Sequence, residues 1–199
     1  MEPVTVPAPA RQPAQQPDLQ PALVTDRLAL WHPHARDHAG LVDLLAPEDV
    51  RRHLGNRPTS VTEEFQRLLR NAGSWALYGY GIFTCRRRDD DTVIGIAGVF
   101  HSWRGFGQGL DDVPEAGWIF APSCWGQGLA REAMTAVLDW FDATHATPQG
   151  PRRVACMIDG DNAPSLALAA RLGFTRYAEH ADGARDVPLL LLERHGSNG

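Results

Sequence analysis

Lysine is absent from this chain of 199 residues, and all nineteen basic residues are arginine. A P-loop places a lysine after its last glycine to reach the phosphates of a nucleotide, so the sequence encodes no P-loop. Basic residues are also outnumbered by acidic ones, and the formal net charge is −5. This balance argues against a broad nucleic-acid-binding surface and leaves a cationic or amine substrate open.

Cysteine is scarce as well, with only Cys85, Cys124 and Cys156. Three cysteines cannot all pair with one another, and none are spaced as CxxC, so neither a disulfide framework nor a zinc site is indicated. A reduced, cytoplasmic setting is therefore expected. The sequence also lacks an apolar run of about 18 residues and a basic region followed by an apolar segment, so we expect no membrane span and no signal peptide.

Large apolar side chains are nearly missing from the first 21 residues, which are rich in proline, alanine and glutamine. Such a segment buries too little surface to offset the entropy lost on ordering. We expect a flexible tail over residues 1–21, for which a role as a proline-rich ligand is a minor alternative. Residues 22–194 are long enough to form one domain with a substantial core, and residues 195–199 form a short polar tail.

One stretch organises that domain. Residues 115–122 form a short apolar run closed by Pro122, as in a buried strand. Residues 123–128 form a glycine-punctuated turn. Apolar residues then recur at helical spacing, which predicts an amphipathic helix over residues 129–145.

The turn before this helix has the physical properties of an anion site. The first turn of a helix leaves about four N–H groups without partners, and the helix dipole adds partial positive charge. Gly126 and Gly128 lack a Cβ, so an anion can approach the backbone closely. The glycines alone are equally compatible with a turn that merely joins strand and helix. A dinucleotide fingerprint does not fit, because Arg131 stands where the third glycine is needed.

The run Trp125-Gly-Gln-Gly-Leu-Ala130 resembles the acyl-CoA loop of the GNAT superfamily of N-acetyltransferases, whose pattern is Arg/Gln-x-x-Gly-x-Gly/Ala. Trp125 takes the Arg/Gln place, Gly128 is the central glycine and Ala130 is the last small residue. The run is especially similar to the branch that includes the ribosomal-protein alanine and serine acetyltransferases, in which Trp-Gly-x-Gly is common.

Two further segments carry the resemblance, which covers residues 23–194. Asn162 is followed by Ser165 and then, eleven positions after Asn162, by Gly173-Phe174, which is similar to a GNAT helix motif. Residues 25–30, Thr-Asp-Arg-Leu-Ala-Leu, are similar to the opening of the same branch. Trp31 departs from the arginine that usually follows in that opening.

The resemblance implies an α/β (α+β) fold. A mixed, mostly antiparallel sheet of about seven strands should be splayed between its fourth and fifth strands and flanked by about four helices. The patterns predict strands at 23–31, 75–85, 93–100, 115–122, 154–158, 176–180 and 187–192. They predict helices at 37–46, 62–71, 129–145 and from Asp161 or Asn162 to 172, with a capping box formed by Ser60 and Glu63.

Two connections are candidates for shaping the site. Residues 101–114 predict a long mobile loop over it, because long loops in compact domains tend to be functional. Residues 47–59 carry Arg51, Arg52, His53 and Arg57. By the resemblance this segment helps to form the wall of the acceptor site, and a solvated basic loop is an equal alternative.

The resemblance further implies acetyl-CoA as cosubstrate, bound in the gap of the sheet. Backbone groups of Ile119 and Phe120 would pair with the pantetheine arm, and Asn162 and Ser165 would flank the arm or the thiol. The amides expected to hold the pyrophosphate belong to Trp125, Gly126, Gln127, Gly128, Leu129 and Ala130.

The implied reaction is direct attack of a primary amine on the thioester in a ternary complex. The amine must lose a proton, and Glu115 is the expected base, acting directly or through water. A role in positioning substrate, or a solvent-facing side chain, is an equal alternative for Glu115. The tyrosine that many family members use as an acid is replaced by Ala169, so Ser165, water or no group protonates the thiolate.

No metal is expected. His32, His34 and His38 have no carboxylate or cysteine at a matching distance, and Pro33 interrupts a strand there. The acceptor is a protein N-terminus or a small-molecule amine, with neither nucleic acid nor a membrane as partner, and a homodimer is compatible with the family. The alternative function is a non-catalytic acyl-CoA-binding module. A nucleotide-binding domain is a weaker rival.

Overall fold

The computed structural model describes residues 20–55, 57–147, 152–181 and 187–196. The predicted N-terminal tail lies outside these residues except at its end, and so does most of the predicted C-terminal tail. No helix among the described residues is long and apolar enough to cross a lipid bilayer.

A single eight-stranded sheet, in the order β1-β2-β3-β4-β5-β6-β8-β7, runs through the molecule. Every neighbouring pair is antiparallel except β5 and β6, so the predicted mixed, mostly antiparallel sheet is confirmed. The strands are β1 (Leu23–Val24), β2 (Leu28–Trp31), β3 (Ile82–Arg87), β4 (Gly95–Trp103), β5 (Asp111–Phe120), β6 (Arg153–Asp159), β7 (Thr175–His180) and β8 (Leu189–His195).

The eighth strand arises because the predicted first strand is two. Residues 23–31 fold back on themselves, with Leu23 opposite Leu30, through a turn in which the Thr25 amide donates to the Leu28 carbonyl. The Thr25 hydroxyl also accepts from the Leu28 amide, so a polar side chain replaces the missing ladder bonds at this turn.

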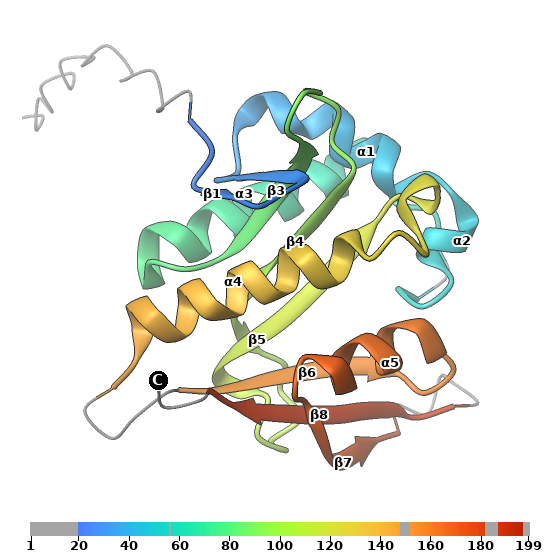
Figure 1. Ribbon diagram of the computed structural model, residues 1–199. Coiled ribbons are helices and arrows are strands. Elements are labelled where there is room, and N and C mark those ends of the chain that lie inside the picture. Colours follow the sequence, from blue (N-terminus) through green and yellow to red (C-terminus); the bar gives the residue numbers. More distant parts are fainter. Residues whose placement is uncertain (1–19, 56, 148–151, 182–186, 197–199) are drawn as a thin grey trace, which may run out of the picture.

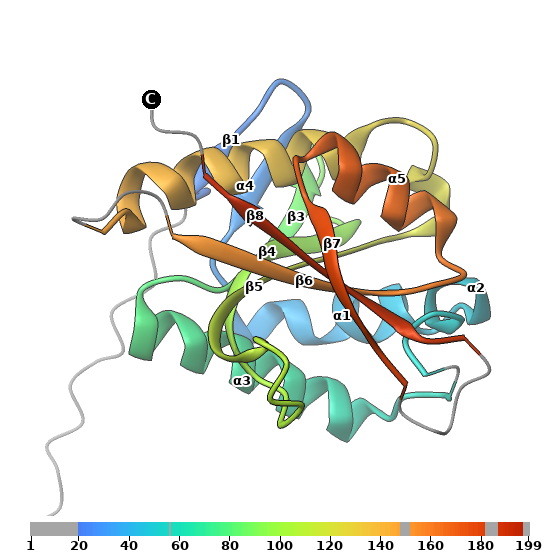
Figure 2. The same cartoon turned by 90° about the horizontal axis from the view of Figure 1, so that it is seen from below.

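Helices cover both faces of the sheet, with α1 and α3 on one side and α4 and α5 on the other (Figures 1 and 2). The α-helices of the described residues are α1 (His38–Leu45), α2 (Glu48–Arg51), α3 (Val61–Tyr78), α4 (Leu129–His145) and α5 (Ala163–Arg171). Short 3-10 turns, η1 (Ala35–Asp37) and η2 (Pro122–Cys124), precede α1 and follow β5. The bounds predicted for α4 agree with the structure.

Helix α3 corrects the prediction of a strand starting at Trp75. It begins with the predicted capping box, in which the Ser60 hydroxyl accepts from the Glu63 amide and the Glu63 carboxylate accepts from the Ser60 amide. It then continues through Gly73 and Trp75 to Tyr78, because a single glycine in helical conformation costs a helix only about 1 kcal/mol. Gly79 ends the helix at φ +75°, a left-handed conformation suited to glycine.

The core has two layers separated by the sheet. The larger layer packs α4 residues such as Val137 and Phe141 against Leu30 and Val99 of the strands. The smaller layer packs α1 and α3 against Ile82 and Ile96. Apolar residues at helical spacing on α4 therefore fix that helix along β4 and hold its first turn near the end of β5.

Strands β5 and β6 pair at only two positions, Glu115 with Ala155 and Ala116 with Cys156. Beyond these positions the strands diverge toward their carboxyl ends (Figure 1). The predicted splay between the fourth and fifth strands of the expected sheet, which are β5 and β6 here, is confirmed. Backbone groups on the facing edges are left without strand partners there, which makes them available to an extended ligand.

The predicted long loop over residues 101–114 is wrong, because β4 extends to Trp103 and β5 begins at Asp111. The result is a hairpin whose glycine-rich tip is closed by the Asp111 carboxylate, which accepts from the amides of Gly105 and Gly107. The tip lies on the C-terminal part of the sheet, where the Tyr177 hydroxyl donates to the Gln108 carbonyl. The acidic residues that follow the glycines thus close a turn, and no phosphate site forms there.

Candidate active site

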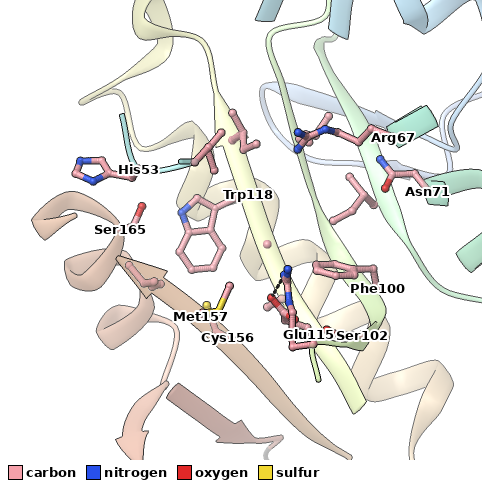
Figure 3. Close-up of a pocket in the computed structure, with 18 of the residues that line it drawn as sticks. His53, Arg67, Asn71, Phe100, Ser102, Glu115, Trp118, Cys156, Met157 and Ser165 are labelled. Carbon is pink, nitrogen blue, oxygen red and sulfur yellow. Dashed lines mark hydrogen bonds and ion pairs between the residues drawn. The ribbon is translucent and has the colours of Figure 1, made fainter. Parts of the chain in front are cut away.

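A cavity of about 590 Å³ opens where β5 and β6 diverge. Its walls come from the segment after α2, from α3, from β4 and β5 on one side, and from β6 and the start of α5 on the other. Figure 3 shows the side chains that project into it. A cavity of this size lies within the usual range for small-molecule sites.

Glu115 lies at the start of the splay and is only 3% exposed. Both of its carboxylate oxygens accept from Arg104, with Nε to Oε2 at 2.9 Å and Nη2 to Oε1 at 2.6 Å. Burial lowers the pKa of the Arg104 guanidinium, but the hydrogen bond and charge of Glu115 outweigh burial and hold that pKa above its usual value. The site therefore contains a buried carboxylate paired with a hairpin arginine, and a solvent-facing Glu115 is excluded.

Asn162 and Ser165 line the cavity from the other wall. Asn162 caps α5, because its side-chain oxygen accepts from the Ser165 amide at 3.2 Å. The cap uses the Ser165 backbone and leaves the Ser165 hydroxyl to face the cavity. Figure 3 shows Glu115 and Ser165 on different sides of the cavity, with the Trp118 ring between the two walls.

The segment after η2 forms the mouth of α4. Gly126 and Gly128 have φ angles of +72° and +75°, so each needs the conformational freedom of glycine. Within the described part of the chain, no protein group accepts from the backbone N–H groups of residues 126–131. Arg27 holds the segment by donating to the Gln127 carbonyl and pairing with Glu132. A rigid set of free amides at a helix N-terminus fits an anion such as a diphosphate.

These observations agree with the family model described as the acetyltransferase (GNAT) domain, which matches residues 27–175. The chain belongs to the GNAT acetyltransferase family. The predicted family is thus confirmed, and acetyl-CoA is the acetyl donor of this family.

Solved structures share the GNAT fold of this chain. One of them is an acetyltransferase from Bordetella pertussis that is assigned to the GnaT family. Its sequence is 36% identical to this chain, the TM-score is 0.75, and the match covers 86% of this chain and 98% of that one. YncA of Salmonella typhimurium, solved with its cofactor acetyl-CoA, is 20% identical, with a TM-score of 0.62 and coverage of 84% and 93%. RimL, a ribosomal L7/L12 alpha-N-protein acetyltransferase, is 16% identical, with a TM-score of 0.69 and coverage of 87% and 92%.

The GNAT fold brings only some of the sequence-predicted residues to the cavity. Glu115, Ile119, Asn162 and Ser165 line it. Residues 125–130 lie beyond the carboxyl end of β5, at the mouth of α4, and do not line it.

Two of the residues predicted to bind acetyl-CoA, Phe120 and Trp125, have backbone groups that are engaged inside the protein. The Trp125 amide donates to the Pro122 carbonyl, and its indole donates to the Phe120 carbonyl at 2.8 Å. The side chains of Phe120 and Leu129 are buried in the core. Free amides at the mouth of α4 therefore begin at Gly126, one residue later than the sequence pattern indicates.

Sequence reasoning missed several polar residues of this GNAT cavity. No sequence pattern marks Arg104 as a site residue, because its pairing with Glu115 depends on the register of the β4–β5 hairpin. On α3, Arg67, Arg70, Asn71 and Ser74 line the cavity at spacings of three and four residues. That spacing is visible in the sequence as a polar helix face, but nothing in it says which face meets a cavity.

Cys156 also lines the cavity, on β6. Burial raises the pKa of the Cys156 thiol, the Glu115 carboxylate raises it further, and Arg104 offsets part of this increase. A raised pKa disfavours the thiolate form that a nucleophilic cysteine needs. The three cysteines are free and buried, and the described residues hold no cluster of histidine, cysteine and carboxylate side chains suited to a metal ion.

Proposed function

We propose that this GNAT protein is an acetyl-CoA-dependent N-acetyltransferase that transfers an acetyl group to a primary amine by direct attack within a ternary complex. The observation that carries the proposal is the cavity at the divergence of β5 and β6, which contains a buried carboxylate and lies next to the free amides before α4. The acceptor is a protein N-terminus or a small-molecule amine.

In this proposal the diphosphate and the pantetheine arm of acetyl-CoA bind to different parts of the protein. Amides of residues 126–131 bind the diphosphate, helped by the partial positive charge at the start of α4. The backbone of Ile119, on the part of β5 that has no β6 partner, pairs with the extended arm, and Asn162 and Ser165 lie across the gap. Acetyl-CoA supplies the thioester carbonyl that the amine attacks.

Glu115 is the proposed base for the amine. The position of Glu115 beside the gap between β5 and β6 supports this role. Its two hydrogen bonds with Arg104 limit how the carboxylate can accept a proton from the amine. Because Arg104 occupies both oxygens, Glu115 takes the proton through a remaining lone pair, through a water molecule, or after Arg104 moves. If Glu115 instead only positions the amine, its replacement raises KM more than it lowers kcat.

Ser165 is the proposed acid for the leaving thiolate. Ala169 stands at the place of the family tyrosine and is fully buried, so it offers no proton. The Ser165 hydroxyl remains on the cavity wall while its amide is held by Asn162. A thiolate is a stable leaving group near neutral pH, so this acid contributes little and water substitutes for it in part.

Location and assembly follow from family analogy. We expect a cytoplasmic protein acting on soluble amines, and a homodimer is compatible with the fold. RimL shows that a GNAT fold of this shape serves an enzyme acting on a ribosomal protein, which keeps a protein N-terminus among the candidate acceptors.

The alternative is an acyl-CoA-binding module without turnover, which Ala169 favours because the usual acid is missing. Thiol release from acetyl-CoA, measured over a panel of primary amines, separates the two. The proposal predicts amine-dependent thiol release, with mass spectrometry showing an acetylated amine. Tight acetyl-CoA binding with no release above the rate of spontaneous hydrolysis, for free amines and peptides alike, would favour the binding module.

A further inference from the structure

One wall of the cavity is basic and belongs to α3. Arg67, Arg70, Asn71 and Ser74 follow one another at i, i+3, i+4 and i+7, so they share a face of the helix. The neighbouring face buries Leu68 against α1 and the sheet, which fixes the rotation of the helix. Figure 3 shows Arg67 and Asn71 reaching toward the cavity from this wall.

Among the cationic side chains that line the cavity, Arg70 differs from the others in its ion pairing. The carboxylates of the cavity are Glu115, which is held by Arg104, and Asp159, which lies 3.7 Å from the imidazole of His53. On the opposite wall, Arg67 has the buried Glu64 carboxylate within ion-pair distance, whereas Arg70 has no such partner among the residues that the structure describes.

Arg67 keeps unused hydrogen-bonding capacity. Its Nε lies 3.2 Å from a Glu64 oxygen, close enough for an ion pair, but the two groups do not have hydrogen-bond geometry. That Nε atom is buried and has no hydrogen-bond partner within the described residues. The other Glu64 oxygen accepts from the Thr59 hydroxyl. Glu64 Oε2 likewise has no hydrogen-bond partner in the described part of the chain, so these two buried atoms face each other. The donors left for a ligand are the Nη groups of Arg67, which make no hydrogen bond within the described residues.

The guanidinium groups of Arg67 and Arg70 lie one helical turn apart, and among the described residues only Arg67 has a carboxylate partner, so an anion placed between the two groups would be stabilised by both. Their planar donor arrays match the two oxygens of a carboxylate, which accepts from such groups in pairs. From this geometry we infer that the acceptor carries a carboxylate bound by Arg67 and Arg70, while its amine faces Glu115. The inference rests on the proposed transferase function and adds the chemical class of the acceptor, an acidic amine.

Such a carboxylate comes either from a free amino acid or from an acidic side chain near a peptide N-terminus. Two series of acceptors distinguish these sources in a thiol-release assay with the full chain. One compares ω-amino carboxylates of increasing length with their uncharged amides. The other compares short peptide amides that carry glutamate or glutamine at the second position. The expected result is a kcat/KM at least about tenfold higher for the acids in one series.

Variants connect this preference to the two arginines. Arg67→Gln and Arg70→Gln should each lower kcat/KM by about tenfold to a hundredfold for the acid and by less than about threefold for its matched amide. Arg70→Lys keeps the charge but loses the planar pair of donors, so it should retain only part of the preference. Arg171→Gln is the matched control, because Arg171 is exposed at the end of α5 and does not line the cavity.

Binding gives a readout that does not depend on turnover. Calorimetric titration of the CoA-loaded protein should show tighter binding of an acid than of its amide, and Arg70→Gln should remove the difference. Equal binding of acid and amide, or variants that weaken CoA instead of the acceptor, would overturn the inference. Those results would leave the transferase proposal standing, whereas failure to bind acetyl-CoA at all would remove the transferase proposal itself.

Discussion

The two regions of this molecule that we propose as anion sites use different kinds of hydrogen-bond donor. At the mouth of α4 the donors are backbone amides, and two glycines at positive φ set their geometry. On the α3 wall the donors are the side chains of Arg67 and Arg70. The first region depends on backbone conformation and tolerates changes of side-chain identity elsewhere in the loop. The second can be altered by a single substitution without changing the fold.

This difference suggests that one region binds the acetyl donor and the other binds the acceptor in the proposed function. A donor that is common to a whole family suits a site made from backbone, which is insensitive to most substitutions. An acceptor that varies from member to member suits a site made from side chains. Substitutions at the mouth of α4 should therefore change KM for acetyl-CoA, whereas substitutions on the α3 wall should change kcat/KM for the acceptor.

The largest effect is expected for Glu115→Gln on the cavity wall. Loss of a general base should lower kcat by about 10²–10⁴, and the pH profile of kcat/KM should lose its acidic limb. Because the change also removes the charge that neutralises Arg104, the protein should be destabilised by about 3 kcal/mol or less, given that Arg104 is partly exposed. The double variant Glu115→Gln, Arg104→Gln should recover part of that stability without recovering kcat. A pH profile identical to that of the parent protein would rule out the base assignment.

Gly128→Val tests the backbone-built region and should have the next largest effect. A β-branched residue at φ +75° shifts the amides of the loop, so KM for acetyl-CoA should rise by about tenfold or more with a smaller change in kcat. Gly173→Val is the matched control. Gly173 also has a positive φ, +84°, and its added side chain would meet open space. Both variants should lose about 1–2 kcal/mol of stability, but only Gly128→Val should change KM for acetyl-CoA.

Ser165→Ala should have a smaller effect, because it removes a hydroxyl that water replaces in part. We expect kcat to fall about tenfold or less, with no change in thermal stability, since the Asn162 cap bonds to the Ser165 backbone. Asn162→Ala provides the contrast: loss of the cap should reduce stability by about 1 kcal/mol. An unchanged kcat for Ser165→Ala would assign the proton to water alone.

The smallest effect is expected for Cys156→Ala. Because burial and the Glu115 charge raise the pKa of this thiol, the thiolate that could attack the thioester is disfavoured. The rate should remain within about threefold of the parent value, in keeping with a packing role. Conversely, an acetylated Cys156 detected by mass spectrometry during turnover would replace direct attack with a covalent route.

The sequence predicted the backbone-built region better than the side-chain-built region, and the reason is physical. Gly126, Gly128 and the apolar spacing of α4 reflect local backbone needs, which short patterns record directly. The start of α3 was predictable for the same reason, because the Ser60–Glu63 capping box is local. Its end was not, since the aromatic Trp75 and Tyr78 are typical of strands and the helix continues to Gly79.

Side-chain positions in the cavity depend on how elements dock. Asn162 and Ser165 were predicted because they belong to a motif of the family resemblance, and Glu115 and Ile119 because of their positions on the strand before the acyl-CoA loop. Arg104 reaches Glu115 only through the β4–β5 hairpin, which the sequence indicated as a loop. The α3 arginines face the cavity because Leu68 faces the core, a rotation that tertiary packing decides. Patterns within one element cannot specify such contacts between elements.

The central claim is that free amides before α4 bind the diphosphate of coenzyme A while the gap between β5 and β6 admits its arm. Calorimetric titration of the full chain with coenzyme A and with pantetheine, which lacks the diphosphate, tests it most directly. The account predicts one coenzyme A per chain, bound at least about tenfold more tightly than pantetheine. Equal affinities for the two compounds, or no heat with either, would contradict it.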